Sequence, residues 1–345
     1  MDPQLQHAFL MDNSPRLGAM QAGERFDLWQ KRARNTLGEM LGLPFFSRVD
    51  DDLCIEWTRE ENGVTETRMT FATEEHYRAA AHLLVPAGIT VPVPVILCLQ
   101  GHSTGMHISL GRPKFPGDTE TISGGDRDFA RQIVARGWAA LALEQRGFGE
   151  CGGTPNGPDC YQSAMAALLL GRTLLGERVW DISRTIDVLT AHFPQIDAGR
   201  IAIMGNSGGG TASIYAAAMD QRIAAVMPSC AFCGYKASIG IQHHCSCNYV
   251  PGIFRHFDRG DLGGLIAPRP LIIVNGAKDE IFPLESANRQ YEIVQQYYAA
   301  AGASNACAHV VGAEGHRFYA DLAWPEFCRL TGWKTAQSRE HRTNA

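Results

Sequence analysis

A serine stands in a run of small residues that is typical of a catalytic nucleophile. Residues 205–210 read Gly-Asn-Ser-Gly-Gly-Gly, with Ser207 as the serine. The short apolar run Ile201–Met204 precedes this segment, and an alanine-rich stretch that predicts a helix follows it. A strand, a tight turn and a helix around the pattern Gly-x-Ser-x-Gly hold a serine hydroxyl in a strained turn above a sheet edge. A glycine-rich loop with an incidental serine is the alternative, and the flanking strand and helix signals argue against it.

A serine hydroxyl is a weak nucleophile near neutral pH, so it needs a general base, and the base needs an acid that orients it. The apolar run Leu271–Val274 leads into a turn that contains Asp279. Because an acidic residue at the end of a sheet strand suits the orienting role, we expect Asp279 to be the acid. Glu280, the next residue in the same turn, is the alternative.

The expected base is His316. It follows the apolar run Ala308–Val311 and stands directly behind a glycine. The nucleophile, the acid and the base then each follow a separate predicted strand, in the chain order Ser207, Asp279, His316. This order is the one expected for an α/β-hydrolase.

Acyl transfer passes through an oxyanion that two backbone amides can stabilise. The amide of Gly208, the residue after the expected nucleophile, is the first candidate donor. The predicted strand Val95–Leu99 leads into a loop with the sequence Gln-Gly-His-Ser-Thr-Gly. We expect the amide of His102 in this loop to be the second donor, with Ser103 as the alternative. Four polar residues are further expected to contact substrate: Gln100, Ser103, His243 and His244. A buried, hydrogen-bonded role is the alternative for the last two.

These residues need a scaffold of strands and helices to bring them together. An amphipathic helix is expected over residues 25–41, and apolar patterns around 53–57, 64–71 and 77–85 predict antiparallel strands. Further along, buried strands are expected at 95–99, 138–143, 201–204, 271–274 and 308–311, with helices over 126–135, 179–191 and 287–301. Apolar strands with helical crossovers predict a parallel sheet covered on both faces. Such a sheet binds ligands at the carboxyl ends of its strands, where the expected triad lies.

The chain resembles the α/β-hydrolases, and within them the acetyl-xylan-esterase-like and dienelactone-hydrolase-like branch. The resemblance extends from the helix that contains Trp29 to about Phe327. It rests on the segments Gln100-Gly101-His102, Arg146-Gly147-Phe148-Gly149, Trp180-Asp181, Gly205-Asn206-Ser207-Gly208-Gly209 and Gly315-His316-Arg317-Phe318, together with Asp279. Gln100 stands where the related loop usually begins with His. The resemblance implies an α/β-hydrolase fold and the hydrolysis of carboxylic esters, often of acetylated sugars.

The length of 345 residues leaves one or two domains open. The expected fold class is α/β, with a mostly parallel central sheet flanked by helices, an N-terminal helical and β extension, and cap-like loops. We expect the helical extension over 1–50 and the α/β-hydrolase domain over 51–335. Loop insertions near 103–125 and 232–265 are expected to shape the substrate pocket. Residues 336–345 are expected to form a disordered tail.

Composition and charge argue against several classes of partner. Lys and Arg number 31 against 36 for Asp and Glu, and the net charge of −5 is not gathered into blocks, so neither nucleic acid nor membrane is expected as a partner. Residues 1–20 lack the basic start and apolar run of a secretory signal, and no apolar run is long enough to span a membrane. A cytoplasmic protein with ten reduced cysteines is therefore expected. The oligomeric state stays open.

Two further sequence patterns could suggest a metal ion or a phosphate-containing cofactor, but the residues around them argue against both. Six residues crowd into eighteen positions: Cys230, Cys233, His243, His244, Cys245 and Cys247. Their spacing matches no standard zinc module, so we expect no metal. Residues 147–152 fit Gly-x-Gly-x-x-Gly after a strand, but the segment that follows is a poor opening for a phosphate-binding helix. We therefore expect no cofactor, and a structural ion pair for the neighbouring Arg146.

The sequence thus predicts a serine carboxylic ester hydrolase that works through an acyl-enzyme on a small-molecule or carbohydrate ester. The resemblance favours short acyl groups, acetyl in particular. Two alternatives stay open. The same apparatus could cleave amides, as in a prolyl-oligopeptidase-like serine peptidase, although the chain lacks room for the propeller of those enzymes. A non-catalytic hydrolase-fold protein would instead bind metal or a partner through the Cys and His cluster.

Overall fold

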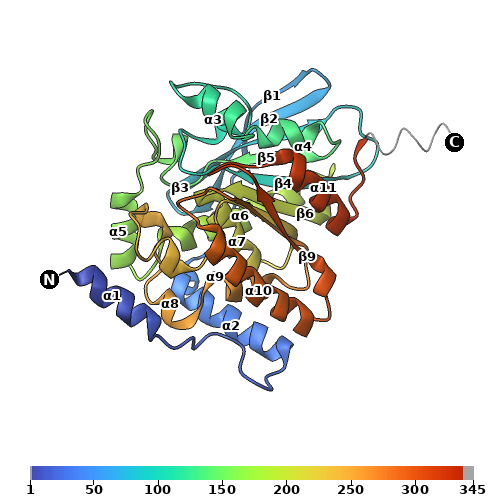
Figure 1. Ribbon diagram of the computed structural model, residues 1–345. Coiled ribbons are helices and arrows are strands. Elements are labelled where there is room, and N and C mark those ends of the chain that lie inside the picture. The colour runs from blue at the N-terminus through green and yellow to red at the C-terminus, as the bar shows by residue number, and fades with distance from the viewer. Residues whose placement is uncertain (1, 337–345) are drawn as a thin grey trace.

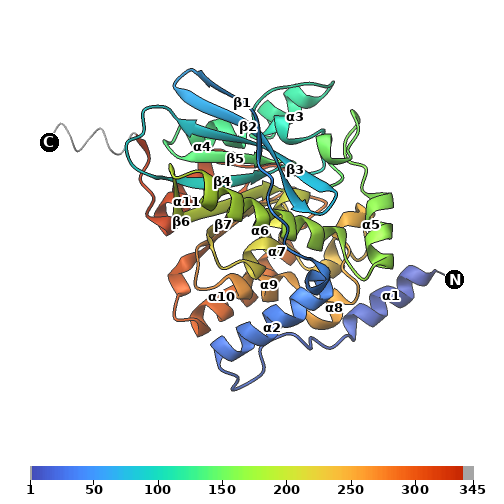
Figure 2. The ribbon, with the colours of Figure 1, turned by 180° about the vertical axis from the view of Figure 1, so that it is seen from behind.

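A nine-stranded sheet runs through the molecule, and helices cover both of its faces (Figures 1 and 2). The computed structural model describes residues 2–336. The strands are β1 (Cys54–Glu61), β2 (Val64–Glu74), β3 (Tyr77–Pro86), β4 (Val93–Leu99), β5 (Ala139–Leu143), β6 (Ile196–Asn206), β7 (Ile223–Ser229), β8 (Leu271–Gly276) and β9 (Cys307–Gly312). Across the sheet they follow the order β1-β2-β3-β5-β4-β6-β7-β8-β9.

The sheet is antiparallel at one end and parallel over the rest. β1, β2 and β3 pair in antiparallel fashion, and β3 is also antiparallel to β5. The remaining neighbours pair in parallel. Every residue of β4, β5 and β8 is buried, which explains why these strands read as continuous apolar runs. The predicted mostly parallel sheet and the predicted antiparallel series before it are both confirmed.

The strand β7 belongs to the parallel part, although the sequence expectation placed no strand there. Its sequence, Ile-Ala-Ala-Val-Met-Pro-Ser, carries two alanines and a proline, which weaken the strand signal. It pairs with β6 on one side and β8 on the other. Its carboxyl end therefore lies beside the turn that contains Ser207.

Eleven helices and six short 3-10 helices are found among residues 2–336. The helices are α1 (Pro3–Asp12), α2 (Phe26–Leu41), α3 (Asp118–Gly124), α4 (Phe129–Val134), α5 (Tyr161–Leu169), α6 (Leu174–His192), α7 (Gly208–Met219), α8 (Ile253–His256), α9 (Arg259–Ile266), α10 (Leu284–Ala300) and α11 (Ala320–Thr331). The 3-10 helices are η1 (Leu43–Phe45), η2 (Met106–Ile108), η3 (Gly149–Cys151), η4 (Tyr235–Ala237), η5 (Ser246–Asn248) and η6 (Ser304–Ala306).

Two apolar cores lie on opposite faces of the sheet. The helices α2, α6, α7, α9 and α10 contribute to one core, and α4 and α11 contribute to the other. In the first core, Trp29 of α2 stacks on Tyr297 of α10, with ring centroids 4.2 Å apart. The N-terminal helix α2 is thus packed onto the body of the protein.

The predicted helices are found close to their expected bounds. The helix expected over 25–41 is α2, which ends at Gly42 with a positive φ of 79°. The helix expected over 179–191 begins earlier, because the Thr173 side chain accepts a hydrogen bond from the Gly176 amide and caps α6. The helix expected over 126–135 is shorter and is α4. The short helices α1, α3, α5, α8 and α9, and α11, are additions to the sequence expectation.

The expected extension and insertions contain secondary structure of their own. Residues 1–50 include α1, α2 and η1, and the stretch 103–125 includes η2 and α3. The stretch 232–265 includes η4, η5, α8 and most of α9. The expected tail, 336–345, lies outside the described residues except for Ala336. Within the described chain, no helix has both the length and the apolar character needed to cross a membrane.

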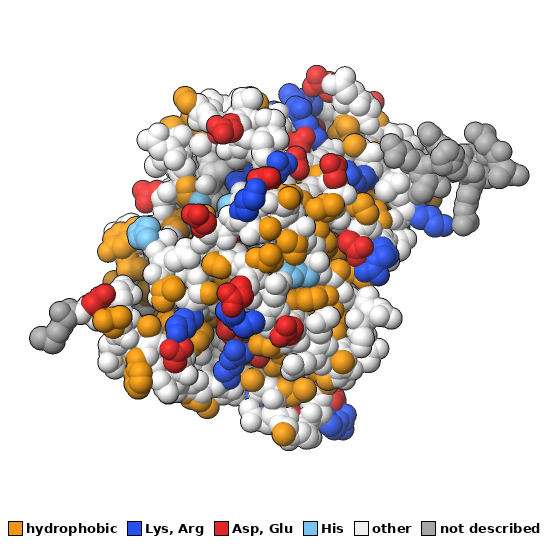
Figure 3. Space-filling model, viewed as in Figure 1, with side chains coloured by type: hydrophobic (Ala, Val, Ile, Leu, Met, Phe, Trp, Pro, Cys, Tyr) orange, Lys and Arg blue, Asp and Glu red, His pale blue; other side chains and the backbone are white. Residues whose placement is uncertain are grey.

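The surface carries charges of both signs. On the face shown in Figure 3, acidic and basic side chains are interspersed, and hydrophobic side chains form several small groups between them. Many of the surface charges form ion pairs, such as Arg329 with Glu326 at 2.6 Å.

Candidate active site

The turn between β6 and α7 holds Ser207 in a strained backbone conformation, with φ 54° and ψ −118°. Two glycines make the turn possible. A Cβ atom at Gly205 would lie 2.4 Å from the backbone of Gly209, and one at Gly209 would lie 2.2 Å from the Leu99 carbonyl oxygen. The Ser207 amide donates to the Ser229 carbonyl at 2.8 Å, which ties the turn to the end of β7. The serine thus caps the N-terminus of α7, where the helix dipole favours developing negative charge.

Asp279 and His316 meet at the same edge of the sheet. Asp279 lies in the turn after β8, and His316 lies in the loop after β9. The His316 Nδ1 atom lies 2.9 Å from Asp279 Oδ2. The Asp279 Oδ1 atom accepts hydrogen bonds from the amides of Ile281 and Phe282 at 2.9 and 3.1 Å. Glu280 is exposed, so the carboxylate in contact with the imidazole is that of Asp279.

The surroundings keep the Asp279 carboxyl charged. Burial alone would raise its pKa, but the hydrogen bond with His316 and the two backbone amides lower it, so that the pKa lies below its usual value. An ionised carboxylate at Nδ1 favours the imidazole tautomer whose Nε2 can accept a proton. The His316 ring also stacks on Phe282, with centroids 5.8 Å apart and an interplanar angle of 19°. Phe282 is a contact of the expected base that the sequence pattern did not single out.

Ser207 and His316 lie at the same sheet edge without a direct hydrogen bond. Among the described side chains, the Ser207 hydroxyl forms no hydrogen bond with the imidazole. Cys230 lies close to the second of these residues. Its Sγ, the Asp279 carboxylate and a His316 ring nitrogen lie within 4.8 Å of one another. Cys230 directly follows Ser229, the residue bonded to the Ser207 amide. Hydrogen bonds of this kind are often long in unliganded enzymes and shorten when substrate binds.

The loop after β4 brings a second backbone amide to the serine. A Cβ atom at Gly101 would lie 3.0 Å from the Ser207 Cβ, so the loop and the turn are in contact. The Gly208 amide is in the first turn of α7 and has no partner within the helix. The His102 amide has no acceptor among the described groups, whereas the Ser103 amide donates to the Gly101 carbonyl at 2.8 Å. The two free amides are those of Gly208 and His102, which favours His102 over Ser103 as the second oxyanion donor.

Gln100 anchors this loop to its surroundings. Its side chain is 1% exposed. The Nε2 atom donates to Ser109 Oγ at 2.5 Å and to the Arg127 carbonyl at 3.1 Å. The Nε2 contacts give Gln100 a positioning role in the loop, while its buried Oε1 has no hydrogen-bond partner among the described groups. The expected contact of Gln100 with substrate stays a prediction.

Glu144, which sequence reasoning missed, supports the same loop from the end of β5. It is 2% exposed and accepts hydrogen bonds from the amides of Met106 at 3.1 Å and Glu150 at 3.4 Å. Burial raises the pKa of Glu144 to about 7, and the backbone hydrogen bonds oppose this only in part. A Cβ atom at Gly149 would lie 2.0 Å from its Oε2, so the carboxyl contacts the backbone of both neighbouring loops. The sequence signal was an acidic residue directly after a buried strand.

The other residues expected to contact substrate, His243, His244 and Ser103, differ in how far they are exposed to solvent. His243 is exposed. His244 is half-buried, with its Nε2 3.0 Å from Ser238 Oγ, and its ring meets the edge of Phe282 at 5.7 Å. Burial and the nearby positive groups, His102 first among them, lower the pKa of His244 to about 4. Ser103 is half-buried, and its hydroxyl donates to the Gly101 carbonyl at 3.4 Å.

The expected structural ion pair of Arg146 is confirmed. Its guanidinium contacts both carboxylate oxygens of Asp181, at 2.7 and 2.8 Å. It also contacts Glu74 at 2.7 Å and Glu177 at 3.4 Å. The neighbouring segment 147–152 forms the short helix η3 and a turn, and the next described helix, α5, begins only at Tyr161.

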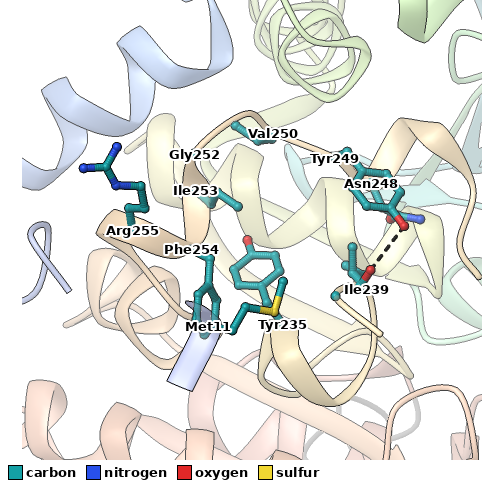
Figure 4. A pocket seen from close by; sticks show the side chains of 11 residues that line it. Met11, Tyr235, Ile239, Asn248, Tyr249, Val250, Gly252, Ile253, Phe254 and Arg255 are labelled. Carbon is teal, nitrogen blue, oxygen red and sulfur yellow. Dashed lines mark hydrogen bonds between the residues drawn. The ribbon is translucent and has the colours of Figure 1, made fainter. Parts of the chain in front are cut away.

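An apolar pocket of about 200 Å³ has a lining separate from Ser207, Asp279 and His316 (Figure 4). Its walls come from the 232–265 segment and from α1, with Tyr235, Phe254 and Met11 on one side. The Tyr249 hydroxyl donates to the Ile239 carbonyl at 3.1 Å, as the dashed line shows. None of the residues expected to act on an ester lines this pocket.

The chain is similar to known hydrolases in sequence and in fold. A model described as the abhydrolase family matches residues 5–306. The chain is 27% identical over 265 residues to “Putative hydrolase YtaP” of Bacillus subtilis (strain 168), covering 75% of this chain and 84% of that protein. A solved structure described as a “putative acetyl xylan esterase” from Bacteroides fragilis NCTC 9343 has a TM-score of 0.75 at 20% identity, covering 94% of this chain and 88% of that one. A glucuronoyl esterase from Solibacter usitatus has a TM-score of 0.64 at 15% identity, covering 92% and 97%.

Proposed function

Since the chain belongs to the abhydrolase family and has the α/β-hydrolase fold, we propose that it is a serine carboxylic ester hydrolase. One observation carries this proposal. A serine in a strained strand-to-helix turn lies at the same sheet edge as a buried aspartate that contacts a histidine at 2.9 Å. These are the three groups that a serine hydrolase uses.

In the first half of the reaction, Ser207 Oγ bonds to the ester carbonyl carbon while its proton passes to His316 Nε2. The carbonyl π electrons move onto the oxygen, and the amides of Gly208 and His102 hold the resulting oxyanion. When the carbonyl re-forms, the bond to the alcohol oxygen breaks, and His316 gives its proton to the departing alcohol. The product on the protein is an acyl ester of Ser207.

In the second half, water attacks the acyl ester and His316 takes one of its protons. Collapse of the second oxyanion releases the carboxylic acid and returns the proton to Ser207. Asp279 stays ionised throughout and stabilises the imidazolium, in keeping with its lowered pKa. Every step uses side chains and backbone amides of this chain.

The proposed substrates are short-chain acyl esters, acetyl esters in particular, including those of carbohydrates. The support is the structural likeness to proteins described as acetyl xylan and glucuronoyl esterases. We place the protein in a reducing, cytoplasmic compartment, because all ten of its cysteines are free thiols.

The test is hydrolysis of p-nitrophenyl esters of graded acyl length by the wild type and by Ser207→Ala. The wild type should cleave the acetyl ester fastest, and Ser207→Ala should lose at least about 10³-fold in kcat. Ser123→Ala, which changes an exposed serine of α3, is the matched control and should keep the wild-type rate. Equal rates for Ser207→Ala and the wild type would overturn the proposal.

A second panel addresses the substrate class. It contains acetylated xylo-oligosaccharides, a methyl ester of glucuronate and a proline-containing amide. Turnover of the acetylated sugars supports the proposed class. Turnover of the amide alone would replace the esterase by the peptidase alternative.

A further inference from the structure

Three thiols and one imidazole come together behind the oxyanion loop. The imidazole is that of His102, and two thiols are those of Cys245, the residue before η5, and Cys247, the middle residue of η5. His102 Nε2 lies 3.3 Å from Cys247 Sγ. The ligating atoms of all three side chains lie within 4.8 Å of one another.

The third thiol comes from Cys160, at the start of α5. It packs in one buried group with Cys247, against which the half-buried Cys245 also packs, and its thiol interacts with both of theirs. The four side chains thus come from three segments that are far apart in sequence. Two of these segments lie outside the Cys and His cluster at 230–247, so the spacing within that cluster matches no standard zinc module.

A buried positive charge lies next to these thiols. Arg178 of α6 is 2% exposed, and its Nη2 lies 3.3 Å from Cys160 Sγ. The guanidinium also donates to the Arg146 carbonyl and lies over the Phe148 ring. Within residues 2–336, no carboxylate forms an ion pair with Arg178. Because an uncompensated buried cation is costly, the negative charge that balances Arg178 has to come from sulfur.

We infer that Cys160, Cys245, Cys247 and His102 bind one zinc ion in a tetrahedral Cys3His site. Thiolate sulfur and imidazole nitrogen are the ligands that zinc prefers, and four such ligands close a structural site. Ligand atoms in such a site lie about 3.6 Å apart. The ligating atoms of His102, Cys245 and Cys247 are within 4.8 Å of one another, and Cys160 Sγ, which lies outside this close group, has to move toward them to complete the set. Each cysteine binds as a thiolate, and the protons leave to solvent.

Charge supports the same stoichiometry. A zinc ion with three thiolates and a neutral imidazole has a net charge of 2 − 3 = −1. The single positive charge of Arg178 then balances the site inside the protein. The ring of Phe148 and the apolar side chains of Ala164 and Leu174 enclose it.

The zinc site would stabilise the oxyanion loop, and this part of the inference rests on the proposed function. A Cβ atom at Gly208 would lie 2.7 Å from Cε1 and 2.9 Å from Nδ1 of the His102 ring, so the ring packs on the nucleophile turn. A metal on Nε2 fixes the ring and with it the backbone of His102. The two amide donors, at Gly208 and His102, would then be held at a fixed separation.

The rest of the 230–247 cluster lies elsewhere. Cys230 is beside Asp279 and His316. Cys233 packs with Phe282 and Ala287 in a separate buried group. The metal site is therefore built from two of the six residues of the cluster, Cys245 and Cys247, and from two residues outside it.

The first experiment measures zinc in the full-length wild type, expressed with added zinc and purified without chelator. Elemental analysis should find about one zinc per chain. Replacement by cobalt should give the visible absorption of a tetrahedral site together with a thiolate charge-transfer band. Ser207→Ala should hold as much zinc as the wild type, so the outcome is independent of whether the protein hydrolyses esters.

The second experiment uses matched cysteine variants. Cys247→Ser and Cys245→Ser should lose most of the zinc and the cobalt spectrum. Cys233→Ser, at a buried thiol outside the group, and Cys54→Ser, at an exposed one, should keep both. Circular dichroism of each variant separates loss of metal from loss of fold.

Three results would overturn the inference. The first is a folded wild-type protein that takes up no zinc or cobalt. The second is equal zinc content in Cys247→Ser, Cys245→Ser and the wild type. The third is a disulfide between two of Cys160, Cys245 and Cys247 in the unreduced protein purified from a reducing cytoplasm, because the oxidised sulfurs could not bind the ion.

Discussion

The buried carboxyl of Glu144 leads us to predict how stability depends on pH. It lies against the proposed oxyanion loop, accepts only backbone amide hydrogen bonds and has no ion pair among the described residues. Burial raises its pKa from the ordinary 4.5 to about 7. Replacing it by the neutral isostere, Glu144→Gln, removes this ionisation and keeps an oxygen that can accept from the Met106 amide.

The sign of the pH dependence of the free energy of unfolding follows from whether Glu144 is protonated in the folded and in the unfolded chain. Below about pH 4.5 the carboxyl is protonated in both the folded and the unfolded chain. Between about pH 4.5 and pH 7 the unfolded chain releases the proton and the folded chain keeps it, so the free energy of unfolding falls as the pH rises. Above pH 7 the loss is complete. A shift of this size corresponds to about 3 kcal/mol in total, of which about 2.5 kcal/mol falls between pH 5 and pH 8.

The assay is urea unfolding of the wild type and Glu144→Gln at pH 5 and pH 8. The variant should gain about 2.5 kcal/mol relative to the wild type between the two pH values. Other groups cancel in this difference. His244, whose pKa is lowered from 6.5 to about 4, has the opposite effect, because its contribution to the free energy of unfolding decreases as the pH falls below 6.5. This contribution is the same in the wild type and in Glu144→Gln.

Glu120→Gln is the matched control, because Glu120 is an exposed carboxyl of α3. Its stability relative to the wild type should be the same at both pH values. If Glu144→Gln behaves like this control, the carboxyl is not forced to hold a proton by burial, and the reasoning about its pKa is refuted.

Three further predictions concern the core and the site. Asp181→Asn should lower the free energy of unfolding by about 3 kcal/mol in urea titrations, because it leaves the buried Arg146 without its bidentate partner. Gly209→Ala should cost about 3 kcal/mol or prevent folding, since its Cβ would lie 2.2 Å from the Leu99 carbonyl oxygen and backbone cannot yield easily. Asp279→Asn should lower kcat on p-nitrophenyl acetate by about 10⁴-fold while the fold is kept, because the imidazole loses the carboxylate at 2.9 Å that sets its tautomer.

Each of these has a matched control. Asp27→Asn breaks an exposed ion pair and should change stability by less than about 0.5 kcal/mol. Gly124→Ala adds a Cβ that meets its nearest atom at an ordinary 3.8 Å and should be tolerated. Glu280→Gln, at the exposed neighbour of the acid, should keep the wild-type kcat. If a control has the same effect as its partner, the specific contact is not the cause.

The sheet and the positions proposed for the triad can be predicted from the sequence because both depend on local patterns. Buried parallel strands read as apolar runs, and the strained turn at Ser207 requires glycines at fixed offsets. The chain order of strands then brings Asp279 and His316 to one edge of the sheet. The alanine-rich and proline-containing strand β7 gave no comparable signal, although its end contacts the nucleophile turn.

The contacts between distant loops could not be predicted in this way. The roles of Gln100 and Glu144 depend on which backbone amides the loops present to them, and no sequence spacing encodes that. The four side chains around His102 come together only because η5 packs against α5, α6 and α7. The sequence spacing places Cys245 and Cys247 in one cluster with Cys230 and Cys233, whereas in the fold those two thiols lie in other surroundings.

The most direct test of the proposed chemistry is to locate the acyl group on the protein. Wild-type protein is mixed with p-nitrophenyl acetate, quenched with acid within the first turnovers, digested and mapped by mass spectrometry. One acetyl group should appear on the peptide that contains Ser207, and it should be absent from Ser207→Ala. Continued ester turnover with Ser207 unmodified, or acetylation only at another residue, would contradict the account.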